Sequence, residues 1–383
     1  MPTIVTTVLA WVPPLLALVS VVYTLGATLA VRAFARAPLP PAAAPEPAVL
    51  LKPLHGAEPR LAANLATFLD QDWPAPVRMV AGTNRADDPA LAALGGLKGD
   101  VAVRTGAPPL GANGKIANLV NMMPDADAVL LILSDSDMAG PRDYVPRVAA
   151  ALAQPGVGAV TCAYRGRGDA MGAGAGWSRF AAAGISYQFA PGVVTSWALG
   201  VGGACMGSTI ALRRPTLDAI GGFAAFADVL ADDHAIGAAV RALGLSVRPV
   251  PRMVLAHGCT ERSMVAVWRH ELRWAATVRG VDPAGHVGSL LTHPLALALL
   301  SLPSTPRAGV VAVVLALAAR CSLAATVDAW VGERSAPRWW LPVRDLFSFG
   351  VFVASFVARS VDWRGATLRM EANGRMTAEP EHP

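Results

Sequence analysis

Residues 131–138, LILSDSDM, carry an aliphatic run that stops at two aspartates, Asp135 and Asp137. Burying an unpaired carboxylate is costly, so a positive charge from the protein or from a ligand must lie close to them. Residues two apart on a simple strand point the same way, so both carboxylates would converge. Such a pair can hold Mg²⁺, which keeps several waters and takes substrate phosphates as its other ligands. The alternative interpretation is a turn with two solvated acids.

A second acidic pair, Asp232 and Asp233, opens a predicted helix in VLADDHAIGAAVRAL, residues 229–243. Carboxylates are favoured there because they face exposed N–H groups and the positive end of the helix dipole. A helix cap explains one acid at this place but not two in succession. The functional interpretation is that Asp233, kept ionised by the helix end, is a general base that removes a proton from an acceptor hydroxyl.

A third cluster, WRHELRWAATVR, residues 268–279, combines arginines and tryptophans just before a hydrophobic zone. This composition is typical of an anchor at a membrane interface. Arg273 and Trp274 are also suited to close over a phosphate and a base or sugar, since a guanidinium matches phosphate oxygens. Both interpretations stay open on the residues alone.

The segment 49–280 must position these residues, and it alternates short apolar runs with helix-like stretches. Continuous hydrophobic strands alternating with helices predict an α/β fold with a mostly parallel, Rossmann-like sheet covered on both faces. Ligands of such sheets bind at the carboxyl ends of the strands. The expected strands are AVLLKPL, VRMVAGTN, VAVRTG, AVLLILSDSD and VGAVTCAY, and the expected helices are PRLAANLATFLDQ, GKIANLVNMM and YVPRVAAALAQ.

Hydrophobic segments flank this domain. Residues 1–36 are predicted to be a transmembrane helix, because the apolar stretch 3–31 exceeds a signal-peptide core of about 7–15 residues. Arg32 and Arg36 follow it and indicate that its amino terminus lies outside and the arginines inside. The linker 37–48, rich in proline and alanine, should be an extended spacer.

The C-terminal membrane region, 281–360, holds candidate segments at 286–303, 309–331 and 341–358, which gives two or three helices before a tail at 361–383. The last candidate begins WWLPVRD and either crosses the membrane or lies in its interface. The stretch 191–212 is rich in small residues and is not expected to cross. Gly202, Gly203 and Gly207 within it predict a tight loop that enters a strand.

Composition supports this division. Of 383 residues only 15% are charged, and the mean hydropathy of +0.44 is too high for an ordinary soluble enzyme. The net charge of +5 comes from arginines scattered beside hydrophobic segments, which favours a cytoplasmic membrane surface over nucleic acid. The four cysteines are far apart without a CxxC pair, so neither a zinc site nor a disulfide framework is expected.

Taken in order, these elements resemble the membrane glycosyltransferases of the ceramide glucosyltransferase family, which carry the GT-A nucleotide-sugar fold. Residues 270–300 are most similar to the bacterial hopanoid-biosynthesis glycosyltransferases of that family. The similar stretches span nearly the whole chain: LLKPLHGAEPRLAANLATFLDQDWP (50–74), ADDPA (86–90), NGKIANL (113–119), LSDSD (133–137), GSTIALRR (207–214), LADDHAIG (230–237), HELRW (270–274) and WRG (363–365).

The resemblance implies a role for each matching residue. Asp88 matches the family aspartate that lies against uridine, and Asp135 the one at the metal and diphosphate. Asp233 matches the catalytic base. Lys115 and Asn118 match a KxxNL element beside the donor.

The family's (Q/R)xxRW element is present with one departure. His270 replaces the usual glutamine or arginine, while Arg273 and Trp274 match. A histidine changes its charge near neutral pH, so a switchable donor stands where the family pattern has a fixed hydrogen-bonding side chain. Asp137 completes a full DxD, whereas animal ceramide enzymes lack this second acid.

The resemblance implies an inverting transfer of a sugar from a UDP-sugar to the hydroxyl of a membrane lipid. Mg²⁺ or Mn²⁺ on Asp135 and Asp137 would neutralise the leaving diphosphate, and Asp233 would deprotonate the acceptor. The expected donor is UDP-N-acetylglucosamine and the expected acceptor is a hopanoid polyol such as bacteriohopanetetrol. The alternative is ceramide with UDP-glucose.

These expectations place the protein in the bacterial inner membrane as a multi-pass protein whose catalytic domain faces the cytoplasm. Two other classes compete. A processive polysaccharide synthase would share the aspartates but would need more spans to form a channel. A non-catalytic membrane scaffold would keep the hydrophobic segments without needing the acids. The sequence gives no oligomeric state.

Overall fold

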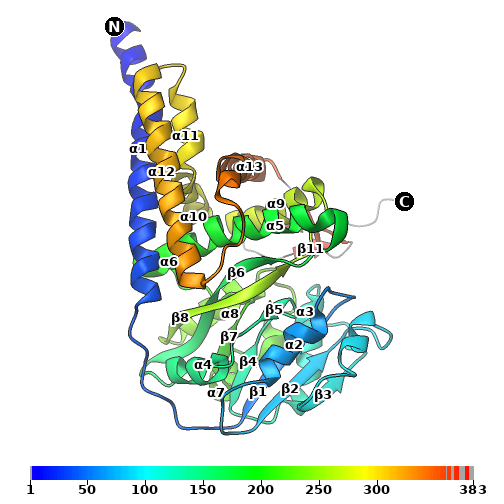
Figure 1. The fold of residues 1–383 in the computed structure, drawn as a ribbon. Coiled ribbons are helices and arrows are strands. Elements are labelled where there is room, and N and C mark those ends of the chain that lie inside the picture. Colours follow the sequence, from blue (N-terminus) through cyan, green and yellow to red (C-terminus); the bar gives the residue numbers. More distant parts are fainter. Residues whose placement is uncertain (1, 359, 364–365, 371–375, 379–383) are drawn as a thin grey trace, which may run out of the picture.

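The computed structural model describes residues 2–358, 360–363, 366–370 and 376–378. Figure 1 shows a helical part, which includes α1 (Pro2–Ala35) and α12 (Pro306–Val331), standing on an α/β domain. The chain enters that domain at β1 (Ala48–Pro53), and α9 (Met264–Val281) follows its last long strand. Trp363 lies in β9 (Ser360–Trp363), while Arg364 and Gly365 of the WRG stretch lie outside the described residues.

The α/β domain contains an eight-stranded sheet with the order β3-β2-β1-β4-β7-β6-β8-β5. Within the described chain, four of its seven strand pairings are parallel, and β7 runs antiparallel between β4 and β6. The predicted α/β fold is therefore confirmed, with a mixed sheet. The remaining strands are β2 (Val77–Gly82), β3 (Asp100–Arg104), β4 (Leu130–Leu133), β5 (Met138–Ala139), β6 (Val157–Gly168), β7 (Ile210–Arg213) and β8 (Ser246–Cys259).

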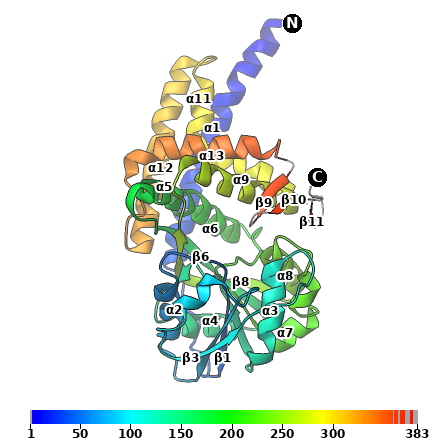
Figure 2. The same cartoon turned by 90° about the vertical axis from the view of Figure 1, so that its right-hand side faces the viewer.

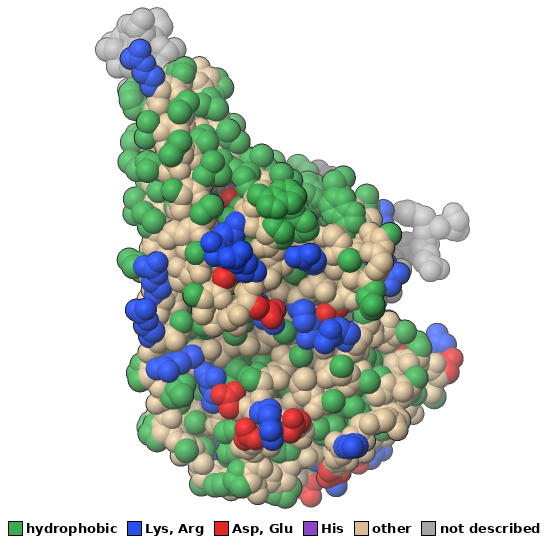
Figure 3. Space-filling view, viewed as in Figure 1, with side chains coloured by type: hydrophobic (Ala, Val, Ile, Leu, Met, Phe, Trp, Pro, Cys, Tyr) green, Lys and Arg blue, Asp and Glu red, His purple; other side chains and the backbone are tan. Residues whose placement is uncertain are grey.

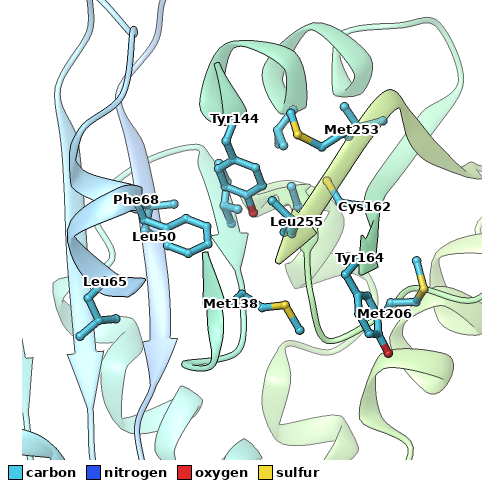
Figure 4. Packing of buried hydrophobic residues seen from close by; sticks show 14 of the residues in the cluster. Leu50, Leu65, Phe68, Met138, Tyr144, Cys162, Tyr164, Met206, Met253 and Leu255 are labelled. Carbon is cyan, nitrogen blue, oxygen red and sulfur yellow. The ribbon is translucent and has the colours of Figure 1, made fainter. Parts of the chain in front are cut away.

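Helices cover both faces of this sheet because its central strands are apolar on both sides. β1 and β4 are buried at every position. On one face Leu50 packs with Phe68 of α2 (Leu61–Leu69) and Tyr144 of α4 (Tyr144–Leu152), as Figure 4 shows. On the other face Leu51 packs with Ile116 of α3 (Gly114–Met122) and with α8 (Asp232–Ala242). The five expected strands and three expected helices all form.

In the helical part, α1 and α12 run in the same direction. Ala17 of α1 packs in one cluster with Ala312, and further along the helix Val31 packs with Val327. The chain between them returns through α10 (Pro283–Gly288) and α11 (Pro294–Ser301), which also packs on α1. Among the described residues, Ala10–Ala35 and Pro306–Val331 are the two helices long and apolar enough to cross a membrane.

Two further helical segments lie across this bundle. The first joins α5 (Ala175–Gly184), a π-helical turn η4 (Ile185–Phe189) and α6 (Ala190–Ala198), and the sequence analysis did not predict it. It contacts α1 through Trp197, whose ring centroid lies 5.6 Å from that of Phe34. The second is α13 (Leu341–Ser355), which lies beside α9 and crosswise to α1 and α12 (Figure 2).

Candidate active site

The two acids after β4 have different partners. The strand ends at Leu133 and a turn follows, so the expectation that Asp135 and Asp137 lie on a simple strand and therefore point the same way is wrong. The Asp135 carboxylate lies 2.8 Å from Lys115 Nζ, and Asp137 Oδ2 lies 3.4 Å from His257 Nδ1 on β8. They remain electrostatic neighbours: burial raises the pKa of Asp135, and the charge on Asp137 adds to that rise.

Lys115 supplies the positive charge that was predicted to lie close to the two acids. Its Nζ lies 3.2 Å from Asp232 Oδ2 as well as next to Asp135. Burial alone would lower the pKa of Lys115, but the two carboxylates reverse this and raise it above its ordinary value. Asn113 caps α3 by accepting from the Lys115 N–H at 3.0 Å, and its amide donates to the Val229 carbonyl at 2.7 Å. The start of α3 is thereby fixed to the segment that leads into α8.

A second lysine, Lys52, lies behind the acidic turn and is fully buried in β1. Its Nζ donates to Ser134 Oγ at 2.9 Å and to the Asp135 carbonyl at 3.1 Å, and it lies 3.3 Å from the centroid of the Phe68 ring. Burial lowers the pKa of Lys52 to about 7. Lys52 was not predicted as a site residue, although a lysine inside an apolar strand is a signal that could have identified it.

Asp233 is the second residue of α8 and is joined to Asp135 through one glycine. Asp233 Oδ2 accepts from the Gly207 N–H at 3.2 Å, and the Gly207 carbonyl accepts from the Asp135 N–H at 3.0 Å. A Cβ at position 207 would lie 2.2 Å from Asp135 Oδ2, so any larger residue in this predicted tight loop would displace the Asp135 carboxylate. Burial, together with the charge of Asp232, raises the pKa of Asp233 to about 6. Asp233 is therefore still mostly ionised at pH 7.

Two residues predicted to bind the sugar donor, Asp88 and Asn118, lie at the same edge of the sheet, near the end of β2. Asp88 is 4% exposed, and its Oδ1 accepts from the Gly56 N–H at 2.8 Å, while its Oδ2 lies 3.6 Å from His55 Nδ1. Asn118 donates to the Gly82 carbonyl at 2.7 Å, and its Oδ1 is buried with no hydrogen-bond partner among the described residues. Asn118 thus holds α3 against β2, and its direct contact with a donor stays a prediction.

The predicted element on α9 approaches the acidic turn through aromatic contacts. His270 Nδ1 is hydrogen-bonded to the Glu261 carboxylate, and its ring meets Trp274 edge-on with centroids 4.5 Å apart. Trp274 in turn lies 6.0 Å from His257, the neighbour of the acidic turn. Arg273, which directly precedes Trp274 in the sequence, is half-buried. His257 and Glu261 were missed because neither belongs to a recognisable local pattern.

The carboxylates of Asp135 and Asp137 fit a metal ion that binds together with the phosphate groups of a ligand. Within the described ranges no cluster of three or more His, Cys, Asp or Glu side chains has the geometry of a complete metal site. Asp137 Oδ1 is buried without a hydrogen-bond partner in that same part of the chain, and the Asp135 side chain is 35% exposed. Two carboxylates leave most positions of Mg²⁺ or Mn²⁺ to waters and phosphate oxygens.

A mixed α/β sheet with acids and a lysine at the carboxyl edge of its parallel strands is the arrangement expected of a glycosyltransferase of the GT-A class, and the family match establishes that class. The chain belongs to glycosyl transferase family 21, whose pattern matches residues 12–376. A search of curated proteins found no match.

Several solved glycosyltransferase structures are similar. One is the mannosyltransferase PcManGT from Pyrobaculum calidifontis in complex with GDP-Man and Mn²⁺, with 18% identity over 90% of this chain and 99% of that chain and a TM-score of 0.49. GalNAc-T7 with UDP, GalNAc and Mn²⁺ has 10% identity, 62% and 51% coverage and a TM-score of 0.41. Glucosyl-3-phosphoglycerate synthase of M. tuberculosis has 15% identity over 61% of this chain and 80% of that chain, with a TM-score of 0.35. At these scores the assignment rests on the family match.

Proposed function

We propose that the chain transfers a sugar from a UDP-sugar to the hydroxyl of a membrane lipid by an inverting, single displacement. The observation that carries this proposal is the link between Asp233 and Asp135 through Gly207, with Lys115 spanning Asp135 and Asp232. A base with a pKa of about 6 and a fixed cation therefore occupy one cluster. A displacement needs both: a base for the attacking hydroxyl and positive charge for the leaving group.

The chain's own residues divide the work. Asp233 takes the proton of the acceptor hydroxyl, and Lys115 favours the ionised form of Asp135 and orients its carboxylate. Asp88 meets the uridine, while Arg273 and Trp274 close over the donor from α9. Asp135 and Asp137 would hold Mg²⁺ or Mn²⁺, which as a Lewis acid neutralises the charge of the leaving diphosphate.

The helices support a membrane-embedded protein. Both α1 and α12 are long and apolar enough to cross, and they run in the same direction, so the chain between them must return across the same depth. Arg32 and Arg36 follow the membrane stretch of α1 on the side of the α/β domain, which favours a cytoplasmic catalytic domain. We accordingly place the protein in the bacterial inner membrane as a multi-pass protein.

Donor and acceptor are proposed from the sequence. The similarity of residues 270–300 to hopanoid glycosyltransferases favours UDP-N-acetylglucosamine and bacteriohopanetetrol. Membership of the ceramide glucosyltransferase family favours the second candidate, UDP-glucose with ceramide.

A two-by-two assay tests these proposals. Purified protein is incubated with each lipid and each donor, with Mg²⁺, Mn²⁺ or a chelator, and the products are weighed by mass spectrometry. We expect one added N-acetylhexosamine on the hopanoid polyol, with release of UDP, and no product in the presence of the chelator. A hexose on ceramide would establish the second candidate, and a ladder of sugar additions would identify a polymerase. No product in any of the four combinations, together with no binding of UDP by calorimetry, would contradict sugar transfer to these lipids.

A further inference from the structure

Helix α13 is amphipathic in the reverse sense to a helix on a water-exposed surface. An apolar stripe at helical spacing faces outward, and charged and hydroxyl side chains face inward. The outward side chains, each at least 43% exposed, are Trp339 just before the helix, Val343, Leu346, Val353 and, just after it, Val357. The inward face, each side chain at most 9% exposed, combines the polar residues Arg344, Asp345, Ser348 and Ser355 with the apolar residues Leu341, Val351 and Phe352.

The length and direction of α13 exclude a simple membrane crossing. Its 15 residues span about 22 Å at 1.5 Å per residue, short of a hydrocarbon core of about 30 Å. Figure 2 shows it lying across the axis of α1 and α12. Figure 3 shows apolar side chains over these two helices and around α13, with Lys and Arg side chains gathered below that level. A basic band beneath an apolar surface is typical of the headgroup region of a bilayer.

We propose that the outward stripe of α13 is a docking surface for the lipid bilayer, immersed in the leaflet that faces the α/β domain, and that this immersion positions α9 over the active site. The proposal rests on the membrane embedding in the proposed function. A bilayer is the occupant that the structure favours, because the stripe continues the apolar surface of the two long helices.

Three contacts fasten α13 to α9. Arg344 donates to the Glu271 carboxylate, and the Trp268 ring meets Phe347 edge-on with centroids 5.4 Å apart. Arg279 donates to carbonyls at the carboxyl end of α13. Glu271 directly follows His270, so a displacement of α13 moves the helix that carries His270 and its neighbouring tryptophan. The Arg344 guanidinium also stacks against Phe347 at 5.2 Å, which keeps it buried and in place.

Spin-label accessibility tests the immersion without any catalysis. In a Cys321→Ala background, single cysteines replace Leu346 and Val353 in the full chain, reconstituted in liposomes of phosphatidylethanolamine and phosphatidylglycerol. The references are Leu18→Cys on the exposed face of α1 and Lys98→Cys in the α/β domain. We expect labels at 346 and 353 to collide with oxygen more than with a water-soluble nickel complex, as at 18. Labels that behave as at 98 would overturn the proposal and leave sugar transfer untouched.

A charge-insertion pair tests the link to the active site. Leu346→Glu with Val353→Glu should lower lipid glycosylation in liposomes by about 10- to 100-fold, since small displacements near reacting groups have costs of that order. Val103→Glu with Val129→Glu, at exposed apolar positions of the α/β domain, is the matched control and should keep its activity. Circular dichroism checks that both variants fold. Unchanged transfer in the folded α13 variant would refute the link between immersion and activity.

Discussion

Arg320 and Asp345 form a bidentate ion pair at 2.8 and 2.7 Å between α12 and α13, and the guanidinium also donates to the Tyr187 carbonyl at 2.8 Å. Both partners are at most 3% exposed. At the edge of the sheet the charges are arranged differently, because several aspartates share two lysines. These are Asp135, Asp137, Asp232 and Asp233 with Lys52 and Lys115.

The difference separates charges that complete the fold from charges that await a ligand. A buried pair with every strong donor and acceptor engaged needs nothing further, and it fixes how two helices meet. A second ion pair of the helical part, Arg338 with Asp328 at 3.1 Å, is more exposed on its arginine side. An excess of negative charge beside a partly exposed carboxylate is instead stabilised when a cation or a cation-bound phosphate arrives. The comparison therefore predicts different consequences for removing a charge in each region.

The largest expected effect is on catalysis, from Asp233→Asn. This change keeps the shape of the side chain but removes the base, so kcat should fall by about 10²- to 10⁴-fold. UDP affinity, measured by calorimetry, should stay within a factor of a few. The matched control is Asp218→Asn, the same substitution at an exposed aspartate, which should leave kcat unchanged. Normal turnover in the Asp233 variant would remove it from the catalytic role.

In the helical part the corresponding change acts on stability. Arg320→Met leaves Asp345 buried without its partner, which should lower the free energy of unfolding by about 3–5 kcal/mol. The double variant with Asp345→Leu removes both charges and should recover most of that loss. Unfolding in detergent, followed by circular dichroism, measures both. A single variant as stable as the parent would show that this pair does not hold α12 to α13.

Local patterns carried much of the site from the sequence. Asp135 was predicted from an apolar strand that ends in acids, and Asp233 was predicted from the start of a helix. Both patterns lie within a few residues of the sequence. The partners could not be predicted in this way. Lys52 meets Ser134 across 82 positions of the chain, and His257 reaches Asp137 only because β8 returns beside β5.

The fold shows the same limit. The parallel strands were predictable from continuous apolar runs, whereas the antiparallel β7 depends on its neighbours and not on its composition. The segment of α5 and α6 was not predicted from the sequence. Its position depends on contacts such as Tyr187 with Asp328, 2.6 Å from hydroxyl to carboxylate, which no local pattern contains.

The substitution Lys52→Met tests whether the buried lysine completes the fold or belongs to the charges that await a ligand. Ser134 Oγ and the Asp135 carbonyl lose their donor, so stability should fall by about 1–3 kcal/mol. Since the same contact orients the acidic turn, metal-dependent UDP binding should weaken as well. Lys98→Met, at an exposed lysine, is the control for both measurements. Lower stability with unchanged UDP binding would place Lys52 with the structural charges of the helical part.

The smallest effect is a pH dependence that only the sheet edge should produce. Because burial and Asp232 raise the pKa of Asp233 to about 6, its ionised form is lost as pH falls through that value. About one tenth of the base remains at pH 5, so kcat/KM should fall about tenfold from its plateau. Burial lowers the pKa of His257, but the charge of Asp137 more than reverses this and raises it. Loss of the His257 proton as the pH rises would therefore lower activity at high pH, which is opposite in sign to the effect of Asp233. An acid limb with the same midpoint in the residual activity of the Asp233→Asn variant would assign the titration to another group.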